Sequence, residues 1–253
     1  MIAALPMYDF GDLPAANDQF WALIRDGLRA QGQDAPEALT HGAPDLWPVW
    51  QSPALVLAQT CGYPYRARLH GKVTLVATPD YGLPGCPPGH YCSVYIARIG
   101  DPRGDLAEFD GAGFAYNEPL SQSGWAAPTT HAAGLGLSLR PVLKTGAHRA
   151  SALAVAEGRA DLAALDAVTW RHLERLDPVA ARLRVVGRTP PTPGLPLICA
   201  AGVDAAALRG ALAEAVAGLP DGPRLVLGLR GIVEIPASAY LAVPNPPPPE
   251  ALT

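Results

Sequence analysis

Two serine hydroxyls and a glutamine amide follow one another at Ser121, Gln122 and Ser123, and Gly124 and Trp125 come next. The preceding residues read as a strand and the following ones as a helix. The first N–H groups of a helix have no partner within it and lie at the positive end of the helix dipole. Such a start binds anions, and Gly124 would let a ligand approach the backbone. The segment therefore predicts an anion site, with an ordinary serine N-cap as the alternative.

A second strand-to-helix junction repeats this arrangement, because Gly146 precedes His148 and Arg149 at the start of another helical pattern. Cationic side chains in a first turn oppose the helix dipole, and an anion shared with the first junction would explain them. We favour a ligand-binding role for His148 and a solvent-facing position for Arg149. Asp166 ends the next strand, where its carboxylate could bind a ligand ammonium or hydroxyl group. It could equally cap the helix that begins at Ala167, and both roles stay open.

Further polar and aromatic side chains follow other apolar runs that read as strands. Ligand sites in open α/β sheets lie outside the carboxyl ends of the strands, so these side chains are candidates for the same site. A single tyrosine is more often a packing residue, but the shared placement at strand ends favours binding. The candidates are Tyr8, Thr60, Tyr63, Tyr65 and Tyr81.

Metal and nucleophile chemistry are disfavoured. Cys86, His90 and Cys92 fall within seven residues, but two prolines interrupt them and no fourth ligand stands at a usual spacing. The G-x-S-x-G, P-loop and G-x-G-x-x-G motifs are missing from the sequence. We therefore predict no catalytic residue, metal or cofactor. Cys86 and Cys92 could bridge a loop in an oxidising compartment, although free thiols are favoured.

The elements that must position these residues alternate between strands and helices almost from end to end. Such alternation predicts an α/β fold with mixed, mostly parallel sheets covered on both faces. The proline-rich residues 244–249 cannot form a regular helix or a central strand. The expected strands are residues 2–6, 55–59, 73–78, 91–98, 113–117, 141–145, 161–165, 182–188, 197–201 and 231–235, and the expected helices are residues 14–31, 123–135, 148–157, 167–176 and 204–219.

Two stretches rich in glycine and proline, residues 98–105 and 189–196, suggest two crossovers between lobes. Residues 1–97 plus 195–253 would then form a discontinuous lobe 1, and residues 98–194 would form lobe 2. The expected architecture is two-lobed, with a hinged cleft.

Composition narrows the function classes. The chain has 253 residues, 49% hydrophobic and 17% charged, which excludes a disordered chain. The net charge of −4 and the lack of a basic run argue against nucleic acid, and they mean that local groups must hold an anion. No apolar run approaches the ~20 residues of a membrane span, and no leader peptide is visible. We expect a soluble cytoplasmic protein, or a periplasmic one if a leader was trimmed.

Four segments resemble the phosphonate/phosphate-type solute-binding proteins of ABC transporters, which have the type 2 periplasmic-binding-protein fold. They are CGYPY at residues 61–65, YCSV at 91–94, SQSG at 121–124 with Pro128 four residues on, and GAHR at 146–149 running into AVAEGRAD at 154–161. The resemblance implies a Venus-flytrap binder in which Ser121, Ser123 and His148 hold phosphonate or phosphate oxygens. Tyr63 and Asp166 would be further cleft residues. Gln122 and Trp125 depart from the family pattern and leave room for a larger organic anion.

The expected function is binding of a phosphonate, phosphate ester or related organic anion in the interlobe cleft. The chain would act as a monomeric solute-binding protein with an ABC permease as candidate partner, or as a cytosolic relative. The alternative is a cytosolic enzyme on the same fold, similar to menaquinone-pathway lyases, in which Asp166 or His148 acts as general base. The effector-sensing domain of a regulator ranks last, because no helix-turn-helix segment precedes the first strand.

Overall fold

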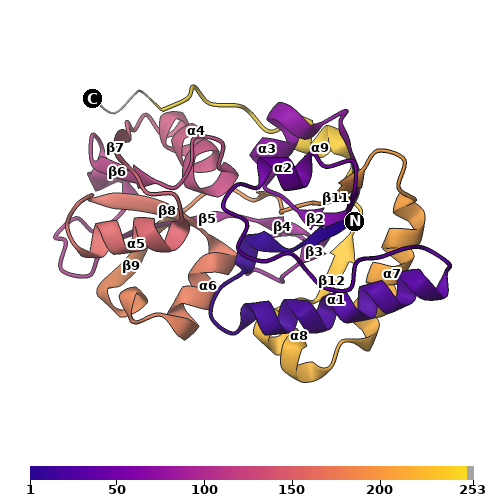
Figure 1. Ribbon diagram of the computed structural model, residues 1–253. Helices are drawn as coiled ribbons and strands as arrows, with labels where there is room; N and C mark the ends of the chain where they lie inside the picture. Colours follow the sequence, from indigo (N-terminus) through magenta and orange to yellow (C-terminus); the bar gives the residue numbers. More distant parts are fainter. Residues whose placement is uncertain (250–253) are drawn as a thin grey trace. The chain divides into compact units, whose positions relative to one another are not determined.

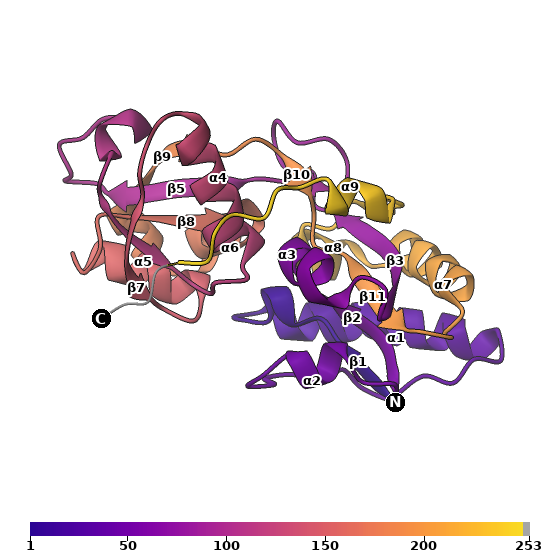
Figure 2. The ribbon, with the colours of Figure 1, turned by 90° about the horizontal axis from the view of Figure 1, so that it is seen from above.

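The computed structural model describes residues 1–249 and divides into two compact units (Figures 1 and 2). Unit 1 contains residues 1–90 and 193–242, and unit 2 contains residues 91–192 and the tail from residue 243. Each unit has its own five-stranded sheet.

The sheet of unit 1 has the strand order β1-β2-β11-β3-β12. β1 runs parallel to β2, whereas β11 pairs antiparallel with both β2 and β3, and β12 pairs antiparallel with β3. All five side chains of β2 are buried, as expected for a short apolar run in the centre of a sheet. The strands are β1 (Ile2–Ala4), β2 (Leu55–Gln59), β3 (Val73–Asp80), β11 (Leu197–Ala200) and β12 (Gly231–Val233).

Helices cover both faces of this sheet, with α1, α7 and α8 on one side and α2, α3 and α9 on the other (Figure 1). A proline near its start and an apolar stripe at helical spacing build α1, which buries Phe20, Ile24 and Leu28. The sequence patterns predict α1 and α7 but miss the short helices and α8. The bounds are α1 (Leu13–Ala30), α2 (Trp47–Trp50), α3 (Gly62–Pro64), α7 (Ala205–Gly218), α8 (Asp221–Leu227) and α9 (Ala237–Leu241).

The sheet of unit 2 has the order β7-β6-β8-β5-β9. β6 pairs parallel with β7 and β8, whereas β5 pairs antiparallel with β8 and β9. Figure 1 shows α4 on one face of this sheet and α5 on the other. The elements are β5 (Ser93–Arg98), β6 (Gly113–Tyr116), the π-helical turn Gln122–Ala126 that continues into α4 (Ala127–Gly134), β7 (Arg140–Lys144), α5 (His148–Ala156), β8 (Leu162–Asp166), α6 (Ala167–Leu176) and β9 (Leu183–Arg188).

The predicted α/β class with mixed sheets is confirmed, but the sheets are not mostly parallel. Among the paired strands of the two five-stranded sheets, three pairings are parallel and five are antiparallel. A parallel neighbour needs a crossover element that returns the chain to the same edge, usually a helix. β5 and β11 instead enter their sheets directly after the chain has passed from one unit to the other, and each runs against its neighbours.

The divisions between the units also differ from the expected ones. The chain passes from unit 1 to unit 2 after residue 90 and returns after residue 192, next to β4 (His90–Tyr91) and β10 (Thr192–Pro193), which pair with each other. The expected boundary at residue 98 falls too late, because β5 is a strand of the unit 2 sheet. The tail from residue 243 belongs to unit 2, not to the lobe expected from the sequence.

Candidate functional site

The first predicted helix start forms in unit 2, where β6 is followed by a turn at residues 121–124 that we call the serine turn. Ser121 has an extended backbone, and its Oγ accepts a hydrogen bond of 3.0 Å from the Gly124 N–H, as an N-cap does. The Trp125 and Ala126 N–H groups donate to the Ser121 carbonyl oxygen at 3.2 and 2.9 Å. Ser121 therefore caps the helix, and its hydroxyl already accepts one backbone hydrogen bond.

The second helix start, residues 146–148, is called here the histidine turn. Gly146 has a φ of +82°, a left-handed conformation that favours glycine, and α5 begins two residues later. Ala147, at the N-cap position, supplies no side-chain cap. The first-turn N–H groups of α5 thus lack the side-chain acceptor that Ser121 gives the other turn.

Parallel strand pairing brings the two turns together. β6 and β7 are parallel neighbours, so their carboxyl ends lie at the same edge of the sheet. The Thr145 N–H donates to Tyr116 O at 2.9 Å, and the Gly146 N–H donates to Asn117 O at 3.0 Å. The chain segments that leave both strands are therefore held side by side before either helix begins.

A hydrogen bond of 2.9 Å joins Ser123 Oγ and His148 Nε2 and connects the two turns directly. Ser123 is buried. Burial of the imidazole lowers the pKa of His148 to about 4, against an opposing effect of a backbone hydrogen bond with Ala164. His148 is therefore neutral at pH 7, and the pair presents neutral polar groups at two helix starts.

The charged side chains nearest the two turns have partners of their own. Lys144 Nζ lies 2.8 Å from Glu118 Oε2, and Arg149 forms an ion pair with Asp177. Arg149 is exposed, as expected from the sequence. An anion at these turns would be held mainly by N–H and O–H dipoles, because the neighbouring cations are already engaged.

Asn117 is a residue of this site that the sequence patterns did not single out. A Cβ atom placed on Gly124 would lie 1.8 Å from Asn117 Oδ1 and 2.8 Å from its Cγ. The amide of Asn117 therefore occupies the space beside Gly124 that was expected to admit a ligand. Asn117 Oδ1 is buried and has no hydrogen-bond partner among the described residues. The only sequence signal was its place at the end of a strand beside the serine turn.

Trp125 and Gln122 lie in the same π-helical turn, and both are buried. The indole N–H of Trp125 donates to Pro247 O at 3.0 Å, and its ring centroid lies 5.2 Å from that of Tyr116. Trp125 thus packs against the strand that leads into the site and binds the tail.

Asp166 acts as the N-cap of α6. Its Oδ1 accepts hydrogen bonds from Val168 N–H at 2.7 Å and Thr169 N–H at 3.2 Å, and the residue is buried. Of the two roles that the sequence left open for Asp166, helix capping and ligand binding, the structure shows the capping role.

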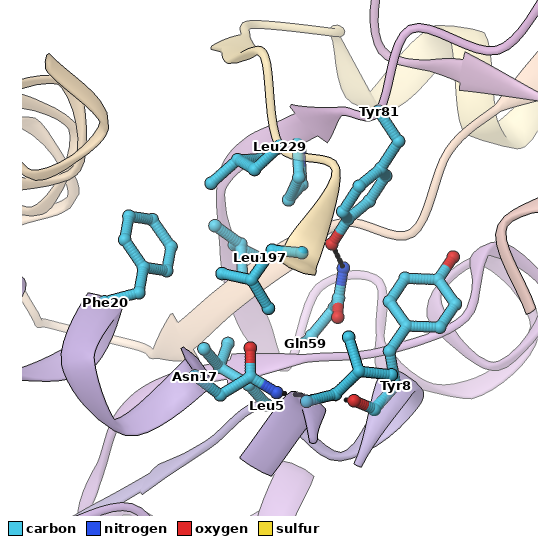
Figure 3. A pocket seen from close by; sticks show the side chains of 11 residues that line it. Leu5, Tyr8, Asn17, Phe20, Gln59, Tyr81, Leu197 and Leu229 are labelled. Atoms are coloured by element: carbon cyan, nitrogen blue, oxygen red, sulfur yellow. Dashed lines mark hydrogen bonds between the residues drawn. The ribbon is translucent and has the colours of Figure 1, made fainter. Parts of the chain in front are cut away.

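In unit 1, Tyr8 and Tyr81 line a small pocket together with Gln59, the last residue of β2 (Figure 3). Their ring centroids are 5.3 Å apart in an edge-to-face arrangement. The Gln59 amide donates to the Tyr81 hydroxyl at 3.3 Å, and Asn17 Nδ2 donates to Tyr8 O at 3.4 Å. The cavity measures about 20 Å³, room for about one water molecule. Leucine side chains form most of the remaining wall.

The other three candidates of unit 1 differ in their surroundings. Thr60 is fully buried, and its Oγ1 has no hydrogen-bond partner in the described part of the chain. The Arg66 guanidinium lies 4.5 Å from the centre of the Tyr63 ring, a cation–π contact. Tyr65 packs edge-to-face on Tyr240 in the core, and burial raises the pKa of its hydroxyl. Tyr65 is therefore a packing residue in this structure.

The cysteine and histidine side chains considered for a disulfide or a metal site do not come together in the described part of the chain. Where the structure describes the chain, none of the four cysteines forms a disulfide bond, and this includes Cys86 and Cys92. Among residues 1–249, no cluster of three or more histidine, cysteine or carboxylate side chains could hold a metal ion. None of the helices in that range has the length and apolar character needed to cross a membrane.

Comparison with known proteins gives a family and a fold. The sequence model of the family described as "ABC transporter, phosphonate, periplasmic substrate-binding protein" matches residues 55–237. A search of curated proteins by sequence finds no match.

Several solved structures are similar in fold. A Xanthomonas citri protein bound to ATP has 18% identity and a TM-score of 0.69, covering 94% of this chain and 92% of its own. PhnD1 of Prochlorococcus marinus in complex with methylphosphonate has 15% identity and a TM-score of 0.71, with 94% of both chains covered. MatC of Rhodopseudomonas palustris with bound malate has 17% identity and a TM-score of 0.58, covering 90% of this chain and 88% of its own.

Proposed function

Because the chain belongs to the phosphonate-binding family of periplasmic substrate-binding proteins of ABC transporters, we propose that it binds a small organic phosphonate or phosphate ester. A member of this family is a ligand-binding component of a transporter and not an enzyme, which removes the lyase alternative. The family also implies an ABC permease as partner.

The observation that carries the proposal is the hydrogen bond between Ser123 and His148. It joins the serine turn to the histidine turn, so that hydroxyl, imidazole and helix-start N–H groups converge on one place. A tetrahedral oxyanion has several oxygens to accept hydrogen bonds, and charge-assisted hydrogen bonds are about twice as strong as neutral ones. The uncapped first turn of α5 would supply further donors to the anion.

Holding an anion with neutral groups has a chemical reason. A cation in the site would attract any anion, whereas fixed N–H and O–H groups require oxygens in particular positions. His148 remains neutral across the neutral pH range, because its pKa is lowered to about 4. The turns would therefore select by the number and direction of ligand oxygens more than by charge.

The same proposal includes ligand contacts from residues of unit 1. We assign the organic part of the ligand to Tyr8, Tyr63 and Tyr81, and we assign a hydrogen bond to Thr60, whose buried hydroxyl has no partner among the described residues. Gln122 and Trp125 in unit 2 and Asp166 at the start of α6 would shape the site indirectly, by packing and by capping. The family resemblance predicts that both units bind the same ligand.

The ligands of the structural neighbours suggest a test panel. Solved neighbours carry methylphosphonate, ATP and malate, which are anions of different size and geometry.

Because the family is described as periplasmic, the expectation of a cytoplasmic protein has no support, and we propose a periplasmic location.

The test is a thermal-shift and calorimetry panel with methylphosphonate, inorganic phosphate, ATP, malate and methanesulfonate. A true ligand at 100 times its Kd stabilises the folded state by about 2.7 kcal/mol. In Ser123→Ala, affinity should fall roughly 10- to 100-fold, since a hydrogen bond to a charged group contributes about 1.5–3 kcal/mol.

The matched control is Ser138→Ala in the same unit, which removes an exposed hydroxyl and should leave affinity unchanged. If no phosphonate or phosphate stabilises the protein, or if both variants bind alike, the proposed site is wrong.

A further inference from the structure

The C-terminal tail crosses between the units a third time. The chain passes from unit 1 to unit 2 after residue 90, returns after residue 192 and crosses again after residue 242. The tail follows α9 and has no helix or strand over residues 243–249, five of which are prolines (Figure 2). Proline fixes φ and favours extended polyproline conformations, so this segment is stiff.

One end of the tail is held in unit 2. Trp125 donates its indole N–H to Pro247 O at 3.0 Å, although the two residues are 122 positions apart in sequence. Trp125 is only 5% exposed, and its ring packs on Tyr116 and Phe114. The anchor therefore lies inside the turn that carries Gln122 and Ser123.

The other end is held in unit 1 by Tyr240 in α9. Its hydroxyl bonds with Thr78 Oγ1 at 2.6 Å and with Gly194 O at 3.1 Å, and the residue is 1% exposed. Two buried aromatic side chains thus fix the polypeptide on either side of the third crossing.

Pro247 follows Tyr240 by seven positions in the sequence, and a fully extended chain spans at most about 3.5 Å per position, or about 25 Å in all. While both anchors hold, the chain cannot separate them further. We propose that the tail, residues 243–249, is a tether that limits how far the two units can move apart, with Trp125 as its release point. This tether adds a mechanical constraint that the proposed ligand site does not require.

The test uses the ligand-free protein, so its outcome is independent of which anion binds. Trp125→Phe keeps the ring but removes the N–H donor, and a stop codon in place of Val243 removes the tail. Small-angle X-ray scattering would measure the radius of gyration and maximum dimension of each protein, after circular dichroism has shown that it is folded. Both variants should show larger values than the parent chain.

Trp21→Phe is a matched control, because Trp21 also donates its indole N–H to a proline carbonyl, Pro36 O at 3.2 Å, but within unit 1. This variant should keep the dimensions of the parent. An unchanged radius of gyration in either Trp125→Phe or the truncated chain overturns the proposal, whatever ligand the protein binds.

Discussion

Gly124 matters at the scale of single residues because a neighbouring side chain uses the space that it leaves free. The amide of Asn117 lies where a Cβ atom on residue 124 would be, and Ser121 Oγ lies 3.2 Å from that position. The glycine therefore allows the Asn117 side chain to pack closely against the serine turn, which a larger residue at position 124 would prevent.

We expect Gly124→Ala to destabilise the protein by about 1–3 kcal/mol, the usual cost of overpacking. The control is Gly134→Ala, at the end of α4, where no atom lies within 4 Å of the added methyl. That change should be neutral or stabilising by up to about 1 kcal/mol. Urea denaturation measures both. Equal effects of the two changes would contradict the packing argument, and Asn117→Ala should reduce the cost of Gly124→Ala.

At the scale of elements, the helix starts of unit 2 differ in how they are capped. Ser121 caps the turn before α4, Asp166 caps α6, and Asp177 accepts from Val179 N–H, but α5 has no side-chain cap. A capping oxygen and a bound anion compete for the same N–H groups. The first N–H groups of α5 are therefore left available to an anion, because no side chain caps them.

Ala147→Ser should supply that cap. Ala147 is exposed and has an extended backbone, as an N-cap requires, so the ligand-free protein should gain roughly 0.5–2 kcal/mol of stability. Affinity for the anion should fall at the same time, because the serine oxygen occupies the donors. Thermal denaturation and calorimetry together measure the two effects. A gain in stability with unchanged affinity would mean that the ligand does not use the start of α5.

At the scale of the whole molecule, the two units carry ionisable groups that respond oppositely to pH. In unit 1, hydrogen bonds from His41 to Asp18 and Asp9 raise the pKa of His41. In unit 2, the hydrogen bond from Arg103 lowers the pKa of Asp101 to about 2, and burial lowers the pKa of His148 to about 4.

The direction of each effect follows from where the proton is held. A raised His41 pKa stabilises unit 1 below the unfolded value of 6.5, and this contribution is lost as pH rises through the folded pKa. The lowered pKa of His148 stabilises unit 2 above 6.5, and that contribution is lost as pH falls toward about 4. Asp101 adds a further loss as pH falls from 3.8 toward about 2.

We therefore expect calorimetry to show two unfolding transitions with opposite pH trends. The transition of unit 2 should fall on acidification from pH 7 to 4.5, and His148→Gln should weaken that fall. The transition of unit 1 should fall on the alkaline side, and His41→Gln should remove that sensitivity. Parallel shifts of both transitions in both directions would show that these groups do not govern the pH dependence.

Local patterns in the sequence predict most of the elements and several of the site residues. The strand at residues 55–59 and the helix at residues 167–176 are confirmed at the expected bounds. The placement of Ser121, Ser123 and His148 at helix starts was predicted because strand-to-helix junctions can be read from apolar periodicity followed by serine or glycine, and their part in binding stays a prediction. Helix starts depend on a few consecutive residues, so neighbouring residues suffice to predict them.

Tertiary structure alone decided which groups meet. The direction of β5 and β11, the contact of Asn117 with Gly124, the burial of Tyr65 against Tyr240 and the bond from Trp125 to Pro247 all join residues through the folded chain. Their energies depend on long-range packing and loop closure, which no local pattern encodes. The sequence by itself determined that two helix starts carry serine and histidine, and folding decided that Ser123 and His148 lie 2.9 Å apart, because parallel pairing of β6 and β7 brings the ends of both strands to one edge.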